Sequence, residues 1–201
     1  PEAFSPADLP LQEIRASLHK ILPLTEDQMR VLVQTPRTQT LRFLAGQKAR
    51  LTLESGQSKE LHIASCPCDG RNLEFLVRRD DSDPFAASIF SGEPVSEIIS
   101  LKGPVGDFVL YDDSSAPVLL LAFGDGIAPI KSLTEHAISV DQAESFRLYW
   151  IGPPAEENYL DRLCRSWNDS LDNFHFTPLP GEVGEAMQCL HSDLPDLRPF
   201  N

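Results

Sequence analysis

One segment, Pro117–His136, constrains the fold of this chain more than any other; its sequence is PVLLLAFGDGIAPIKSLTEH. Val118–Ala122 is short and wholly apolar, as is typical of a strand covered on both faces of a sheet. Gly124 and Gly126 permit a sharp turn, and Pro129 falls in the first turn of the helix expected next. The segment therefore predicts a strand–turn–helix unit of an α/β domain, whose free N–H groups form a natural phosphate site.

Asp125 lies between these two glycines and places a carboxylate where a bound phosphate would lie. A carboxylate at this position can accept hydrogen bonds from the free N–H groups of the helix, and it opposes an incoming anion. Two interpretations stay open. Either Asp125 blocks a nucleotide site, or it is an ordinary capping residue.

Length and charge limit the class of protein. The 201 residues suffice for one large or two small domains. The net charge of -13 argues against nucleic acid or an anionic membrane as the main partner, and it is compatible with a basic protein partner. No apolar stretch is long enough to span a membrane, and we expect no membrane span.

Four cysteines occur, at Cys66, Cys68, Cys164 and Cys189, without the spacing of a metal site. We therefore predict no metal ligand. We interpret the four as reduced thiols, which predicts a cytoplasmic protein.

The sequence pattern changes once along the chain. We expect a linker or arm over residues 1–10, a β-barrel with one short helix over 11–112, and an α/β domain over 113–201. The short helix is Phe85–Phe90, with Asp83 as N-cap and Pro84 in its first position. The strands expected in the barrel are Met29–Val33, Ala49–Leu53, Glu60–Ala64, Leu73–Arg78, Ile98–Lys102 and Phe108–Tyr111.

After Pro117 the pattern alternates between strand and helix, which predicts a parallel sheet. The fold class is thus an antiparallel β-barrel followed by a parallel α/β domain. The elements expected here are strands Val118–Ala122, Phe146–Trp150 and Phe174–Pro178, and helices 128–138, Ala155–Trp167 and Gly184–Leu190.

Four local motifs resemble one family, the ferredoxin–NADP⁺ reductase superfamily. Phe43–Gln47 resembles its FxxGQ strand entry, and Leu61–Pro67 lies at its RxYSxxSxP flavin motif. Gly103–Phe108 matches its GPxGxF turn, and Gly124–Ile130 resembles its GTGIAPI turn. The likeness is strongest to the reductase components of oxygenases and of deoxysugar biosynthesis.

The resemblance implies a barrel that holds FAD and an α/β domain that receives NAD(P)H. Electrons then pass from NAD(P)H through FAD to a protein acceptor. The resemblance assigns no catalytic residue. Carried over residue by residue, the flavin-facing positions are Lys59, Leu61, His62, Ile63, Ala64, Phe85 and Ala86. The dinucleotide-facing positions are Gly124, Asp125, Gly126 and Ile127.

Several of these positions depart from the family pattern. Lys59 replaces an arginine and lacks its bidentate fork, and Leu61 replaces a tyrosine and lacks its aromatic face. His62 replaces a serine, either as an altered flavin contact or proton donor or as a barrel histidine with a local partner. Asp83 can cap the short helix whose N–H groups the family offers to the FAD pyrophosphate, and Ala86 has no hydroxyl.

The second domain departs from the family in two further ways. Ile151–Pro154 lacks the arginine that meets an NADP 2′-phosphate, so NADH is the preferred dinucleotide if one binds. The family's last strand, with its CGP motif, is not found before Asn201, so we expect the domain to be incomplete at its C-terminus.

Two hypotheses about function follow. The chain is an electron-transfer oxidoreductase module whose activity is put in question by its altered motifs, or it is a pseudo-reductase that serves as a protein-interaction or assembly module. Both predict a protein partner, as electron acceptor or as complex subunit.

Overall fold

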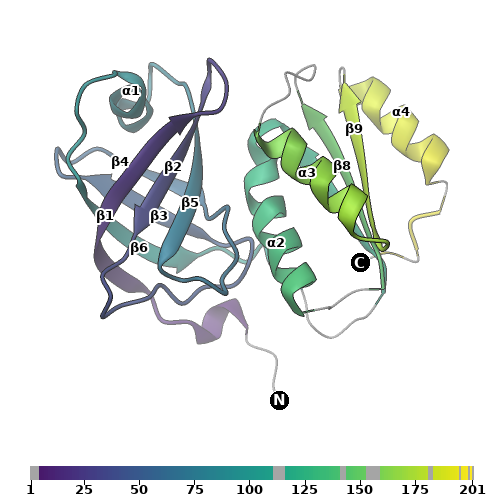
Figure 1. The fold of residues 1–201 in the computed structure, drawn as a ribbon, viewed down its shortest axis with the longest axis horizontal. Coiled ribbons are helices and arrows are strands. Elements are labelled where there is room, and N and C mark those ends of the chain that lie inside the picture. Colours follow the sequence, from purple (N-terminus) through teal and green to yellow (C-terminus); the bar gives the residue numbers. More distant parts are fainter. Residues whose placement is uncertain are drawn as a thin grey trace.

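The structure is a computed structural model that describes residues 5–110, 116–140, 144–152, 159–180, 183–194, 196–198 and 200. Figure 1 shows a β-barrel on one side and an α/β domain on the other, with helix α2 between them.

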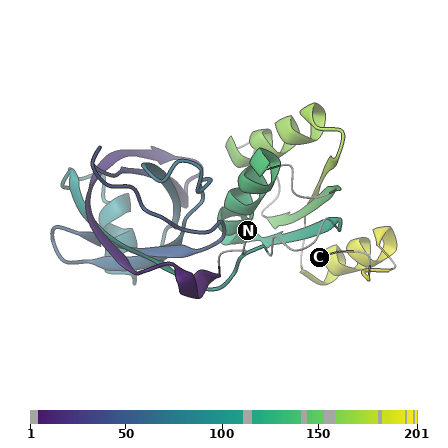
Figure 2. The same cartoon turned by 90° about the horizontal axis from the view of Figure 1, so that it is seen from below.

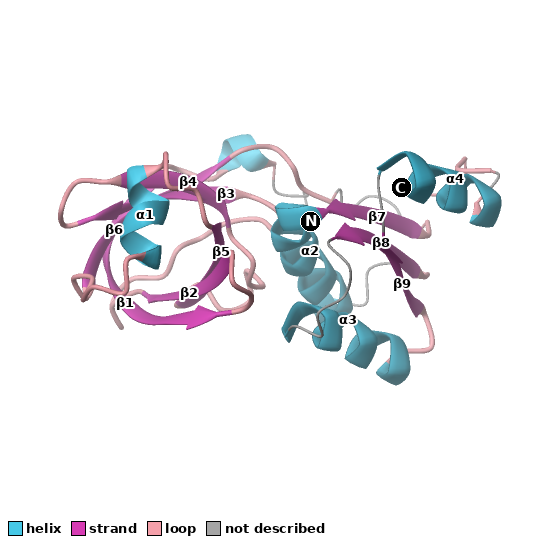
Figure 3. Ribbon diagram, turned by 90° about the horizontal axis from the view of Figure 1, so that it is seen from above, coloured by secondary structure: helices cyan, strands magenta, loops and turns pink. Residues whose placement is uncertain are grey.

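Six antiparallel strands form the first domain, in the order β4-β3-β6-β1-β2-β5. In the first strand alternating side chains, those of Ile14, Ala16 and Leu18, face the interior. A bridge between Ile63 and Phe75 brings the two ends of the sheet together, so the strands curl around one core (Figure 3). The strands are β1 (Gln12–Pro23), β2 (Gln28–Gln34), β3 (Lys48–Leu53), β4 (Ser58–His62), β5 (Asn72–Arg78) and β6 (Ile98–Val105), after a short helical turn at Pro6–Asp8.

Helix α1 (Pro84–Phe90) packs into this core through Phe85, Ala86 and Ile89. It begins where the sequence predicts, because Asp83 caps it and Pro84 supplies a helical φ at its first position.

The second domain is a parallel sheet in the order β7-β8-β9, formed by β7 (Val118–Phe123), β8 (Phe146–Gly152) and β9 (Phe174–Pro180). Helices α2 (Ile127–Val140) and α3 (Tyr159–Ser170) cover one face, and α4 (Val183–Asp193) covers the other (Figure 2). A short 3-10 turn, Gly124–Gly126, joins β7 to α2.

The predicted fold class, a barrel followed by a parallel α/β domain, is confirmed. Two details differ from the prediction. Phe108–Leu110 is not a strand, and Tyr111 lies outside the described residues; the long strand β1 has no counterpart among the predicted strands. The predicted boundary at 112/113 and the predicted helix start at Ala155 also fall outside the described residues.

The prediction of four reduced cysteines is wrong for two of them, because Cys66 and Cys68 form a disulfide. The turn after β4 places their Cα atoms 5.2 Å apart, within the range that a disulfide spans. Cys164 and Cys189 are free. Among the described helices, none combines the length and the apolar character that crossing a membrane requires.

Candidate functional site

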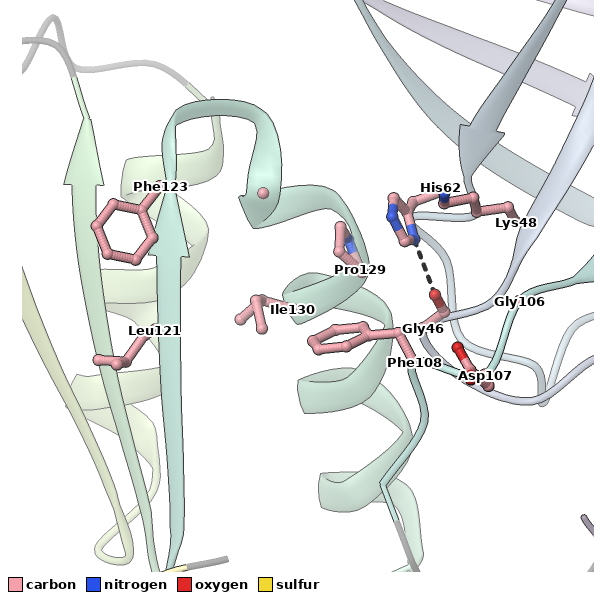
Figure 4. Close-up of a pocket in the computed structure, with 11 residues that line it drawn as sticks. Gly46, Lys48, His62, Gly106, Asp107, Phe108, Leu121, Phe123, Pro129 and Ile130 are labelled. Carbon is pink, nitrogen blue, oxygen red and sulfur yellow. Dashed lines mark hydrogen bonds between the residues drawn. The ribbon is translucent and has the colours of Figure 1, made fainter. Parts of the chain in front are cut away.

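A cleft of about 360 Å³ lies at the junction of the two domains (Figure 4). The start of β3, the end of β4 and two turns of the barrel form one wall, and β7, the Gly124–Gly126 turn and the first turn of α2 form the other. Its apolar and aromatic lining is typical of sites for small organic ligands. The lining residues are Gly46, Lys48, His62, Gly106, Asp107 and Phe108 on the barrel side, and Leu121, Phe123, Gly126, Pro129 and Ile130 on the other.

Buried Gln47 holds the barrel wall in place. Its side chain accepts a hydrogen bond from Leu44 N at 2.8 Å and donates one to Gly106 O at 2.9 Å. The FxxGQ and GPxGxF motifs therefore meet here, and the glutamine of the first fixes the turn of the second. Gly46 has a φ of +91°, a conformation that favours glycine.

His62 faces the cleft from the end of β4. Its Nδ1 lies 2.8 Å from Gly46 O, and its ring meets the edge of Phe108 at 6.3 Å between centroids. Burial lowers the pKa of His62, and nearby Lys48 lowers it further, although Gly46 O opposes both effects. His62 is therefore neutral at pH 7, with its proton on Nδ1 because a carbonyl oxygen can only accept. This histidine has a local partner and also lines the cleft.

Asp83 caps the N-terminus of α1, where the family resemblance leads us to expect the pyrophosphate of FAD. Its Oδ1 accepts hydrogen bonds from Phe85 N at 2.9 Å and Ala86 N at 3.3 Å, as the sequence predicts. Its Oδ2 pairs with Lys59. Burial raises the pKa of Asp83, but the Lys59 ammonium and the two N–H groups outweigh burial and hold it below its usual value. Phe85 N, Ala86 N and the Lys59 ammonium, which could otherwise bind a phosphate, are thus paired with Asp83.

We expect Asp83→Ala to lower the free energy of unfolding by about 1 kcal/mol at pH 7, because the α1 cap is lost. Asp83→Asn retains the cap and loses only the charge, so its loss is smaller. A lowered pKa stabilises the fold above the unfolded value of about 3.9, and this stabilisation disappears as pH falls through the folded value. Urea unfolding of wild type and Asp83→Asn should converge below that pH; a constant difference down to acid pH would contradict this role.

Asp125 is not a cap, which corrects one sequence-based interpretation. Its Oδ1 accepts a hydrogen bond from Gln28 Nε2 at 2.8 Å, and its Oδ2 lies 2.9 Å from Arg78 Nε. The carboxylate therefore connects the turn after β7 to strands β2 and β5 of the barrel. In the same turn Gly124 O accepts a hydrogen bond from Trp150 Nε1 at 3.1 Å.

A second contact between the domains is buried and centres on Lys131 of α2, which is 3% exposed. Its Nζ donates to Ala64 O at 2.9 Å and lies 2.8 Å from Glu135 and 3.4 Å from Glu74. Sequence reasoning misses this network. The available signal is a lysine in the otherwise apolar first turns of α2.

The predicted site residues fall into three groups. His62 and Gly126 line the cleft. Lys59 and Asp125 are held in ion pairs, Lys59 with the helix cap Asp83 and Asp125 with Arg78. The other predicted site residues neither line the cleft nor form ion pairs. Leu61 is partly buried against the barrel core, and Gly124 lies in the turn after β7. The rest are buried: Ile63, Ala64, Phe85, Ala86 and Ile127.

The residues at the barrel position do not fit the pyrophosphate of FAD. Asp83 occupies the N–H groups and pairs with the nearest cation, Lys59, and its charge repels a phosphate. Leu61 packs against the barrel core and offers no aromatic face to a flavin ring.

No family profile matches the chain. A CDP-6-deoxy-L-threo-D-glycero-4-hexulose-3-dehydrase reductase of Yersinia pestis is 30% identical over 184 residues, which cover 88% of this chain and 55% of that protein. The chain thus spans about half the length of this relative.

Two solved structures are similar in fold. A cytochrome P450 reductase of Amycolatopsis matches with a TM-score of 0.82 and 23% identity over 96% of this chain and 61% of that one. A ferredoxin NADP⁺ reductase of Neisseria gonorrhoeae, solved with FAD and NADP, matches with a TM-score of 0.74 and 19% identity. The match covers 95% of this chain and 80% of that one. The chain is therefore a homologue of ferredoxin reductase-type flavin reductase modules and has their fold.

Proposed function

We propose that this chain is a pseudo-reductase: it keeps the fold of an electron-transfer reductase, does not bind FAD tightly, and acts as a protein-interaction or assembly module. The proposal rests on the contacts of Asp83. Its carboxylate accepts hydrogen bonds from the N–H groups of Phe85 and Ala86 at the start of α1, and it pairs with the Lys59 ammonium. A pyrophosphate would have to displace this carboxylate and lie beside its charge.

The second domain supports the same proposal. Asp125 is held by Gln28 and Arg78 in the turn where a dinucleotide phosphate would bind, so its charge opposes that phosphate. Both carboxylates use barrel cations that could otherwise attract a nucleotide.

A protein partner is supported by the relatives and by charge. The Yersinia relative is named as the reductase of a dehydrase, and the Amycolatopsis protein as a reductase of a cytochrome P450. The net charge of -13 favours a partner with a basic face.

The cleft favours a second candidate, an NADH-dependent electron-transfer module that holds FAD weakly. Neutral His62 and exposed Gly126 line a space with aromatic walls that suits a planar ring. FAD, when bound, would supply electron transfer from NADH to a protein acceptor. His62 would then contribute a ring nitrogen without a proton.

Titration of FAD into the purified chain separates the two candidates. We expect no saturable binding below about 100 μM, which corresponds to less than about 5.5 kcal/mol of binding free energy. Flavin fluorescence and calorimetry measure the affinity. Saturable FAD binding below about 100 μM, with flavin that NADH bleaches, would establish the electron-transfer candidate instead.

The combined variant Asp83→Gly with Asp125→Thr tests the blocking carboxylates directly. We expect its FAD affinity to rise at least about tenfold, since the removal of a close like charge is worth on the order of 1 kcal/mol or more. The control is Lys48→Met, which changes a charge at the cleft but leaves both carboxylates in place. Equal FAD binding in wild type and the combined variant would count against the blocking role.

A further inference from the structure

Helix α2 contacts the barrel at Glu74 of β5 and at the segment from Ala64 to Cys68. Three consecutive residues of this segment make hydrogen bonds to side chains of α2. The bonds run from Lys131 Nζ to Ala64 O at 2.9 Å, from Ser132 Oγ to Ser65 O at 2.7 Å, and from Cys66 N to Glu135 Oε2 at 3.1 Å.

The Cys66–Cys68 disulfide closes the end of this same segment. Cys66 N binds α2, and Cys66 Sγ accepts a hydrogen bond from Cys68 N at 3.3 Å. Cys68 is exposed, whereas Cys66 is half-buried. The disulfide therefore restrains Cys66, which contacts the second domain. The sulfur of exposed Cys68 is the one that a reagent in solution can reach.

We propose that Cys66 and Cys68 form a reversible thiol–disulfide site whose redox state sets the rigidity of the domain junction. Its co-reactant is a dithiol, either a small molecule or a thioredoxin-type protein. The disulfide takes no part in the ion pairs of Asp83 and Asp125, so this proposal does not depend on the proposed pseudo-reductase function. Cys68 is exposed, and exposed disulfides are typically the labile or regulatory ones.

The exchange reaction balances without a further cofactor. A thiolate of the dithiol attacks Sγ of Cys68, the Cys66–Cys68 bond breaks, and the Cys66 thiolate leaves and takes up a proton. The second thiol of the reductant then closes its own disulfide and releases Cys68 as a thiol. Two electrons and two protons thus pass from the dithiol to the protein, and the reverse reaction restores the disulfide.

The other two cysteines serve as internal standards. Cys164 is buried, and burial raises the pKa of its thiol to about 12, so it reacts slowly in the folded chain. Cys189 is exposed on α4 and reacts in either redox state. Neither shares an element with the Ala64–Cys68 segment.

Thiol counting on the folded chain tests the site. Air-equilibrated protein should show one rapidly alkylated thiol, Cys189, and treatment with dithiothreitol should raise this number to three. Mass spectrometry of peptides assigns the new labels, and Cys189→Ser removes the background. The proposal would be overturned if three thiols were alkylated rapidly before reduction and treatment with an oxidised dithiol did not lower that number to one.

Hydrogen exchange measures the effect on the junction. We expect the amide of Cys66 to exchange about tenfold faster in the reduced chain, because the restraint on its contact with Glu135 is lost. The variant Cys66→Ser with Cys68→Ser should match the reduced wild type in either redox condition, and amides of β3 should not change. Equal exchange of the Cys66 amide in oxidised and reduced wild type would overturn the link between the disulfide and the junction.

Discussion

Lys131→Met should lower the free energy of unfolding by about 3 kcal/mol, the lower end of the range for a broken buried ion pair. The substitution removes the ammonium that bonds Ala64 O and neutralises Glu135 and Glu74. The loss stays at the lower end because Arg30 Nη2 still lies 2.7 Å from Glu74. Urea denaturation followed by circular dichroism gives the value.

Lys48→Met is the matched control for Lys131→Met. Lys48 pairs with Glu60 at 3.7 Å, and both side chains are more than a third exposed (39% and 38%). Removal of such a pair changes stability by less than about 1 kcal/mol. If the two variants lose the same amount, the contact of Lys131 with the barrel does not stabilise the fold, and the domains are joined mainly by apolar packing.

The sequence predicts those elements whose signals are local. The strand–turn–helix segment after Pro117 and the Asp83-capped helix are both found because their apolar runs, glycines and cap lie within a few residues of one another. Strand β1 has a local signal over only part of its 12 residues, where Ile14, Ala16 and Leu18 alternate with polar residues. Its alternation of buried and exposed residues ends after Leu18, where a register shift between Leu18 and Lys20 interrupts its pairing with β2.

The same distinction applies to the site. The role of Asp83 as a cap depends on Phe85 and Ala86, which are its neighbours in sequence, and it could be predicted. The partners of Asp125 are Gln28 and Arg78, which only the packing of the two domains brings near. Sequence spacing contains no information about such contacts. For this reason both domain contacts, at Asp125 and at Lys131, became apparent only in the folded chain.

Gly46→Ala should lower the free energy of unfolding by roughly 2–5 kcal/mol. A side chain at a φ of +91° is strained by about 1–2 kcal/mol. Its Cβ would also overlap the carbonyl oxygen of Phe108, a backbone atom that moves only with its whole segment, which adds about 1–3 kcal/mol. The displaced segment includes the Phe108 ring, which packs against His62 at the cleft.

Gly56→Ala separates the two causes of this loss. Gly56 has a φ of +96°, yet an added Cβ would meet no atom within 4 Å, so only the backbone strain of about 1–2 kcal/mol remains. An NMR titration gives a second measurement, at the cleft itself. Burial is the largest cause of the lowered His62 pKa, so displacement of Phe108 should raise that pKa toward its ordinary value of about 6.5 in Gly46→Ala and leave it unchanged in Gly56→Ala. Equal stability losses in the two variants, with the His62 pKa unchanged in both, would show that the close approach of Gly46 to Phe108 does not hold the barrel wall of the cleft.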